Sequence, residues 1–198
     1  MKKMITILVA LSATVGLFAQ GNNLITNGGF EKIVKRSLAQ DKTLQNLTKR
    51  GWDFGAGPLV EMPNEWTPNA SAGKVKLEIV KKAEKADNVH SGEYALKISN
   101  EKFAHIYTRG DKAGTYEFTI WAKGKGTVRL TAYCYGKNFY KNLRLVECKG
   151  LNDTWQKYTA TVDIAANDKR TETFAVALTV DNGTAYVDDI SMVKVVKK

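Results

Sequence analysis

Three side chains in one short run, His105, Tyr107 and Arg109, form the combination in this sequence best suited to acid–base chemistry. Their alternate spacing places them on one side of the chain where it is extended. An imidazole or a phenol can remove a proton while a cation neutralises a carboxylate, which is the chemistry of a polysaccharide lyase. The sequence has no G-x-S-x-G, no H-E-x-x-H and no phosphate-binding loop, and no pair of acids stands out for glycoside hydrolysis. We therefore expect a protein that is not an enzyme, with a lyase as a remote alternative.

Flat aromatic side chains beside polar ones indicate a second kind of chemistry, the binding of sugars. The C–H groups of a pyranose pack on aromatic rings, while its hydroxyls need directional partners. Strand alternation separates such residues from aromatics that share a face with aliphatic residues and are expected in the core, namely Tyr116, Phe118, Tyr158 and Phe174. If their strands share one sheet, its concave outer face is lined by Tyr107, Trp121, Arg129, Tyr133 and Tyr135. Each of these aromatics has packing as the alternative role, and Trp52 and Trp66 either rim a cleft or fill the core.

The elements that must position these residues are strands. From Lys74 onward, apolar residues alternate with polar ones, as Val75, Leu77 and Ile79 do, and the alternation returns in six later runs. Turn residues separate the runs, and Asn182-Gly183 predicts a hairpin between the last two. Roughly eight to ten short strands indicate an all-β, two-sheet antiparallel sandwich, a jelly roll. Residues 32–50 predict a short helical insertion, as one helix or two turns, ended by Gly51.

The first 19 residues have the layout of a secretory signal peptide. Lys2 and Lys3 precede the apolar run 5–11, and small residues lead to a cleavage point before Gln20. The alternative is a retained N-terminal anchor, and no other stretch approaches the length of a membrane span. We expect residues 20–198 to form a single β-sandwich domain that is secreted or periplasmic, with no membrane span after cleavage.

The basic charge of the chain, formally +10 at pH 7, raises the question of an anionic partner. Loss of Lys2 and Lys3 with the signal peptide would lower it to +8. The basic residues are scattered rather than clustered, and an exported protein seldom meets nucleic acid, so we expect no nucleic-acid partner. The charge indicates either a solvated surface or attraction to an anionic surface or polysaccharide.

The two cysteines, Cys134 and Cys148, flank a segment rich in turn residues. If a hairpin turns near Lys141, the two lie opposite each other on neighbouring antiparallel strands, close enough for a disulfide. An exported protein can oxidise them. We predict a structural disulfide or, alternatively, two buried thiols.

Five segments together carry a resemblance to a known family: Asn23–Glu31, His90–Ile98, Trp121–Gly124, Thr154–Tyr158 and Ala185–Met192. In this order they resemble the jelly-roll carbohydrate-binding modules of the family 4, 9, 16 and 22 type, within the galactose-binding-like group. The resemblance extends from Asn23 to Val193 and departs from the family at the insertion. It implies a secreted, non-catalytic module that binds a polysaccharide or oligosaccharide by aromatic stacking, and the basic charge of the chain favours an anionic glycan. Because the same fold serves other roles, a structural or adhesive cell-surface or periplasmic protein that docks on another protein is the alternative.

The resemblance also implies a structural calcium ion at one end of the sandwich. Carboxylates of Glu31 and Asp188 would bind it, with backbone carbonyls near Gly29, Ser91 and Glu93. Calcium prefers oxygen ligands of these kinds. The alternative is that Glu31 is an exposed acid and that Asp188, or its neighbour Asp189, only completes the last strand.

Overall fold

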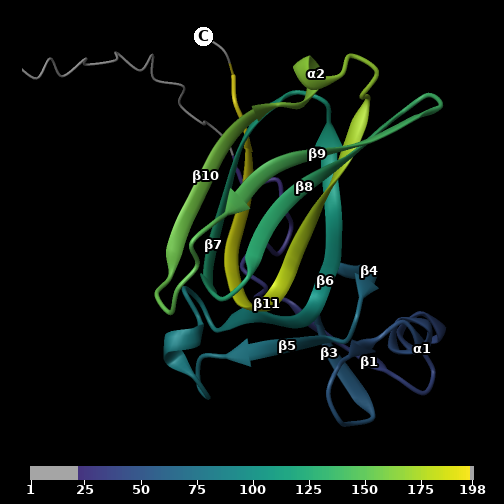
Figure 1. Ribbon diagram of the computed structural model, residues 1–198, viewed down its shortest axis with the longest axis vertical. Coiled ribbons are helices and arrows are strands. Elements are labelled where there is room, and N and C mark those ends of the chain that lie inside the picture. Colours follow the sequence, from purple (N-terminus) through teal and green to yellow (C-terminus); the bar gives the residue numbers. More distant parts are fainter. Residues whose placement is uncertain (1–21, 197–198) are drawn as a thin grey trace, which may run out of the picture.

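The computed structural model describes residues 22–196, which form two sheets packed face to face with a smaller two-stranded sheet beside them (Figure 1). The predicted all-β sandwich is therefore confirmed, and the predicted signal peptide lies outside the described residues. No helix within residues 22–196 is long and apolar enough to cross a membrane. The elements are β1 (Ile33–Ser37), α1 (Lys42–Lys49), β2 (Trp52–Asp53), β3 (Leu59–Pro63), β4 (Thr67–Ala72), β5 (Val75–Lys81), the 3₁₀ turn η1 (Ala86–Asn88), β6 (Tyr94–Lys112), β7 (Thr115–Gly124), β8 (Thr127–Gly136), β9 (Phe139–Cys148), β10 (Gln156–Asp163), α2 (Ile164–Asn167) and β11 (Thr173–Lys194).

Two long strands, β6 and β11, belong to both large sheets. The beginning of β6 pairs with β5 and with the end of β11, and β7 and β10 at one side and β2 at the other complete this first sheet. The end of β6 pairs with β4 and with the beginning of β11, and β8 and β9 complete the second sheet. Figure 1 shows both long strands curving at the lower end of the sandwich as they pass from one sheet to the other.

The core lies between the two sheets and follows the alternation seen in the sequence. Tyr116, Phe118 and Phe174 are buried there as predicted, and Tyr158 packs against the same cluster half-buried. Trp52 and Trp66 are also buried, so they fill the core rather than rim a cleft. The alternate side chains of each strand, those not in the core, face outward, so each sheet has one outer face.

The hairpin predicted at Asn182-Gly183 is wrong. Asn182 does have a positive φ of 49°, but the chain bends there and continues as β11 with a shift in register between Asp181 and Gly183. The segments on either side do not pair with each other, because each pairs with β6 and with a different further strand, β8 or β7. Left-handed backbone at Asn-Gly serves equally well for a bulge that turns a strand into the second sheet.

The insertion is partly a helix. Residues 33–37 form β1, which pairs with β3, and α1 follows with Asp41 as its N-cap, accepting hydrogen bonds from the backbone N–H groups of Thr43 and Leu44. Gly51 has a φ of 98° just beyond the helix, so the predicted end point is correct. The insertion thus places a helix and a small sheet beside the sandwich (Figure 1).

The predicted disulfide does not form, because the hairpin turns earlier than expected. Gly136 lies opposite Phe139, so the turn is at Lys137-Asn138 rather than near Lys141. Cys134 consequently pairs with Lys141 and Cys148 with Val128, at opposite ends of β8. Both cysteines are free and buried, which matches the alternative of two buried thiols.

Burial makes both thiols unreactive, because it raises the pKa of Cys148 to about 12 and that of Cys134 above its usual value. We expect a disulfide-exchange reagent at neutral pH to modify neither cysteine in the folded protein and both in denaturant without reductant. Mass spectrometry counts the modified thiols. Failure of either cysteine to react in denaturant would contradict the free-thiol assignment.

Candidate functional site

A groove runs along the outer face of the second sheet, above the first part of β11. Its floor consists of the outward-facing side chains Ala175, Ala177 and Thr179, which are small. The strands on both sides, β6 and β8, carry large aromatic and charged residues at the same register positions. Small residues on a central strand between large residues on its neighbours produce a trough along the strand.

The groove contains two hollows. The first has a volume of about 790 Å³ and lies at the Asp181 end of β11. It is lined by Lys102, Phe103, His105, Arg129, Thr131, Tyr133, Asn142, Arg144, Thr179, Asp181 and Asn182. The second hollow, of about 360 Å³, lies at the other end, beside Arg109, Tyr135 and Ala175.

A hydrogen-bonded pair separates the two hollows. His105 Nδ1 lies 2.6 Å from the hydroxyl oxygen of Tyr133. His105 is opposite Thr179 and Tyr133 is opposite Ala175, so the pair reaches across the groove over Ala177. Ala177 faces outward but is fully buried, as expected for a floor residue covered in this way. Burial lowers the pKa of His105, so the imidazole is neutral at pH 7.

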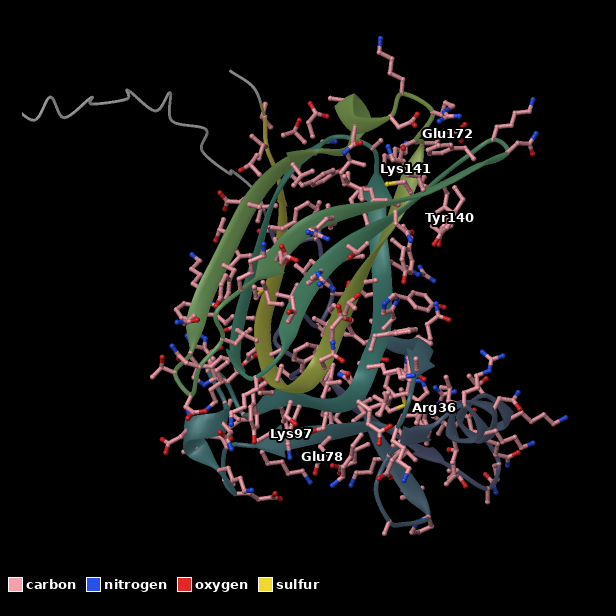
Figure 2. All side chains as sticks on the ribbon, in the orientation of Figure 1. Arg36, Glu78, Lys97, Tyr140, Lys141 and Glu172 are labelled. Carbon is pink, nitrogen blue, oxygen red and sulfur yellow. The ribbon has the colours of Figure 1, made fainter. Side chains whose placement is uncertain are left out.

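A tyrosine cluster stands at the second hollow. Tyr135 and Tyr140 are opposite each other on β8 and β9, with ring centroids 5.5 Å apart. Tyr107, Tyr135 and Tyr140 are 37%, 42% and 58% exposed, unusually high for large aromatic side chains, whereas Tyr133 is buried. Figure 2 labels Tyr140 on the hairpin of β8 and β9 that extends beyond the body of the sandwich. The cluster therefore offers exposed aromatic surface beside the groove.

Four of the five predicted binding residues, Tyr107, Arg129, Tyr133 and Tyr135, lie on this face. The prediction that Trp121 joins them is wrong, because β7 belongs to the first sheet. The Trp121 ring instead stacks on His90, with ring centroids 3.8 Å apart. The lyase trio is also divided: His105 lines the first hollow, Arg109 lines the second, and Tyr107 is exposed between them at the position opposite Ala177.

The sequence reasoning missed several residues of the groove: Lys102, Phe103, Tyr140, Asn142 and Arg144. A signal existed on β9, where Tyr140, Asn142 and Arg144 alternate with the apolar residues Leu143 and Leu145. A shift in register then brings Glu147 to the position opposite Arg129.

Arg129 is held in place by acids from two strands. Its Nε lies 3.0 Å from Glu147 on β9, and its Nη1 contacts the carboxylate of Asp181 on β11. Glu147 also contacts Lys149 and Arg144, and the hydrogen bonds from Lys149 and Arg129 hold the pKa of Glu147 down at about 2. Glu147 is therefore ionised at neutral pH, and its contact with Arg129 fixes the guanidinium at the wall of the first hollow.

Several solved structures share this architecture. The xylan-binding CBM22-2 domain of Paenibacillus barcinonensis Xyn10C matches with a TM-score of 0.50 and 15% identity over 66% of this chain and 92% of that chain. TmCBM61 in complex with β-1,4-galactotriose matches with a TM-score of 0.50 and 19% identity over 88% of this chain and 99% of that chain. The fold is the jelly roll of these carbohydrate-binding modules.

A third matching structure contains a catalytic-family module in addition to the jelly-roll module, as its name states. The CBM22-1–GH10 modules of Clostridium thermocellum endo-1,4-β-D-xylanase 10B, complexed with xylohexaose, match with a TM-score of 0.53 and 12% identity. The match covers 68% of this chain but only 27% of that chain. The sequence itself matches no family model and no curated protein, so the likeness is one of jelly-roll fold.

The segments that carry the sequence resemblance meet at one end of the jelly roll. Glu31 accepts hydrogen bonds from the backbone N–H groups of Glu93 and Tyr94, at 3.1 and 3.2 Å. Asp188 accepts them from His90 and Ser91, at 3.0 and 3.2 Å. Carboxylates from both ends of the chain thus hold the same turn between η1 and β6.

The predicted calcium ligands Glu31, Ser91 and Asp188 are therefore close together, and the two carboxylates are hydrogen-bonded to backbone N–H groups. Both carboxylates face N–H donors, which would repel a cation, and residues 22–196 contain no group of three or more His, Cys, Asp or Glu side chains able to hold a metal ion. Asp188 is fully buried, and burial together with the adjacent Asp189 raises its pKa to about 7. Calcium binding stays a prediction, which a calcium titration followed by melting temperature would test.

Proposed function

We propose that this protein is a non-catalytic carbohydrate-binding protein that holds a glycan chain in the groove of the second sheet. The observation that carries the proposal is the small-residue floor between polar walls, with three exposed tyrosines at one end. Rings of this kind stack on sugar faces, and the surrounding polar groups are suited to hydroxyls. Solved structures of the same fold are described as xylan-binding or are complexed with galactotriose or xylohexaose, which supports the proposal.

The length of the groove favours an oligosaccharide over a single sugar. A strand rises about 3.3 Å per residue, so the floor from Ala175 to Asp181 spans about 20 Å. The basic charge of the whole chain adds long-range attraction for anionic polysaccharides, and this attraction weakens with salt. We also propose that the protein is exported, on the basis of its first 19 residues.

A glycan-array screen of the purified protein tests this proposal. We expect binding to one class of polysaccharide, reduced but not abolished at high salt, without any change in the glycan. Circular dichroism confirms that the sample is folded. Absence of binding to every glycan by the folded protein would contradict the proposal and favour the alternative of a protein that docks on another protein.

The same incubations separate binding from catalysis. A lyase acting on a uronate polymer creates a double bond that absorbs in the ultraviolet. We expect no rise in absorbance, because His105 is hydrogen-bonded to Tyr133 at the first hollow while Arg109 lies at the second, so the lyase trio is not assembled at one place. A steady rise would contradict the non-catalytic assignment.

A further inference from the structure

The first hollow differs in chemistry from the tyrosine end of the same groove. Its lining carries three cationic side chains, Lys102, Arg129 and Arg144, and one acid, Asp181. These cations come from three strands, β6, β8 and β9, which the fold brings to one place. The groove therefore has an aromatic end and a cationic end.

The single acid in the lining does not offset the cations. Asp181 contacts Arg129 directly, and Glu147 behind the wall is shared by Arg129, Arg144 and Lys149. Lys102 and Arg144 are exposed, so their charges are directed at solvent and at any ligand in the hollow. A positive excess at the mouth of the hollow remains after every ion pair is counted.

The hydrogen-bonding groups of these cations are donors only. Lysine and arginine have no acceptor atoms, so their best ligands are oxygens that carry negative charge. The two acids that hold Arg129 fix the orientation of its guanidinium before a ligand arrives, which lowers the entropic cost of binding. A carboxylate or a sulfate group suits such a wall better than a neutral hydroxyl.

We propose that the first hollow is an anion subsite that binds the carboxylate or sulfate groups of an acidic glycan, while its sugar rings stack on the tyrosine cluster. This inference rests on the proposed function, because it assigns a ligand class to the same groove. Lys102 and Arg144 supply the mobile charges, and Arg129 supplies a fixed one. The His105–Tyr133 pair marks the boundary between the subsite and the stacking end.

Three oligosaccharides of equal length test the proposal by isothermal titration: an oligogalacturonate, a sulfated oligosaccharide and a neutral β-1,4-linked oligosaccharide. We expect at least one acidic ligand to bind about ten-fold more tightly than the neutral one, the effect of about one well-placed charge contact. The two acidic ligands distinguish a carboxylate from a sulfate as the group recognised. The double variant Lys102→Gln/Arg144→Gln should lose this ten-fold advantage, so that the variant binds the acidic and the neutral ligands with about equal affinity.

A matched control separates the subsite from overall charge. Lys82→Gln/Lys85→Gln removes the same two charges from exposed positions beside η1 and should change no affinity more than about two-fold. Equal affinity for acidic and neutral ligands, or equal losses in the two double variants, would overturn the anion subsite while leaving glycan binding intact. Absence of binding to all three ligands by the folded protein would overturn the proposed function and the subsite with it.

Discussion

The double variant Tyr107→Ala/Tyr135→Ala is expected to weaken glycan binding about 30-fold and to leave the melting temperature nearly unchanged. Truncating an aromatic contact at the centre of a binding surface costs about 1 kcal/mol or more, and two such losses amount to about 30-fold in affinity. Both tyrosines are exposed on the groove face, so the fold loses little packing when they are removed. Isothermal titration with the best ligand from the array measures the affinity, and thermal unfolding measures stability.

Tyr94→Ala is the matched control for this variant. Tyr94 lies at the beginning of β6, the strand that also carries Tyr107, but it pairs with Lys81 in the first sheet. It is half-buried and distant from the groove along the strand, so its removal should leave glycan affinity unchanged. Binding by Tyr107→Ala/Tyr135→Ala at the affinity of the unaltered protein would show that the ligand does not use this face.

Strand alternation predicted which side chains are buried and which face outward. The inner positions of β7 and β11, such as Phe118 and Phe174, and the outer positions of β8, such as Arg129 and Tyr135, all follow the parity of the sequence. Burial of alternate residues is a local property, because each strand of a sandwich has one face in the core. This is why four of the five predicted binding residues share the groove face.

Sheet membership could not be predicted in the same way, and Trp121 shows the reason. Its parity on β7 is outward, as expected, but β7 pairs with the end of β11 and not with the beginning. An alternating pattern does not show which strand will be the partner, and here the two long strands β6 and β11 each run through both sheets. The bend at Asn182 that makes this possible has the same residue chemistry as a hairpin.

The cysteines illustrate a related limit on register. A turn placed near Lys141 puts Cys134 opposite Cys148, whereas the observed turn at Lys137-Asn138 separates them by most of the length of the hairpin. Several residues in this segment, including Gly136, Asn138 and Asn142, are suited to turns, so composition does not select the turn. Because the hairpin is longer than expected, β9 includes Tyr140 and Arg144, which lie beside the groove.

The glycines at the start of the described chain lead to the second large effect: Gly28→Ala is expected to destabilise the protein by about 3 kcal/mol or more. A Cβ at Gly28 would lie 1.9 Å from the backbone oxygen of Ile190, which cannot move aside as a side chain can. The same oxygen accepts a hydrogen bond from the Asn23 side chain, and the Ile190 N–H donates to the oxygen of Gly28. Clashes with backbone force the chain apart and cost several kcal/mol in the worst cases.

The neighbouring Gly29 provides the control, because alanine there would meet a side chain and not the backbone. Its Cβ would lie 3.2 Å from Asp189 Oδ1, and a shift of a few tenths of an ångström relieves the contact. We expect Gly29→Ala to change stability by less than about 1 kcal/mol, since an alanine also restricts the unfolded chain. In thermal unfolding, Gly28→Ala should lower the melting temperature by about 6 to 12 °C and Gly29→Ala by far less.

Equal effects of the two substitutions would contradict the close approach of the first segment to β11. The expected difference would show that close packing against β11 requires glycine at position 28 of the segment Asn23–Glu31. Since Asn23 also accepts the Met192 N–H, this segment joins the last strand through both backbone and side chain. The resemblance to carbohydrate-binding modules would then rest, at this end of the chain, on residues that hold the jelly roll together, while the residues that we propose to bind a glycan lie on the second-sheet strands β6, β8 and β9.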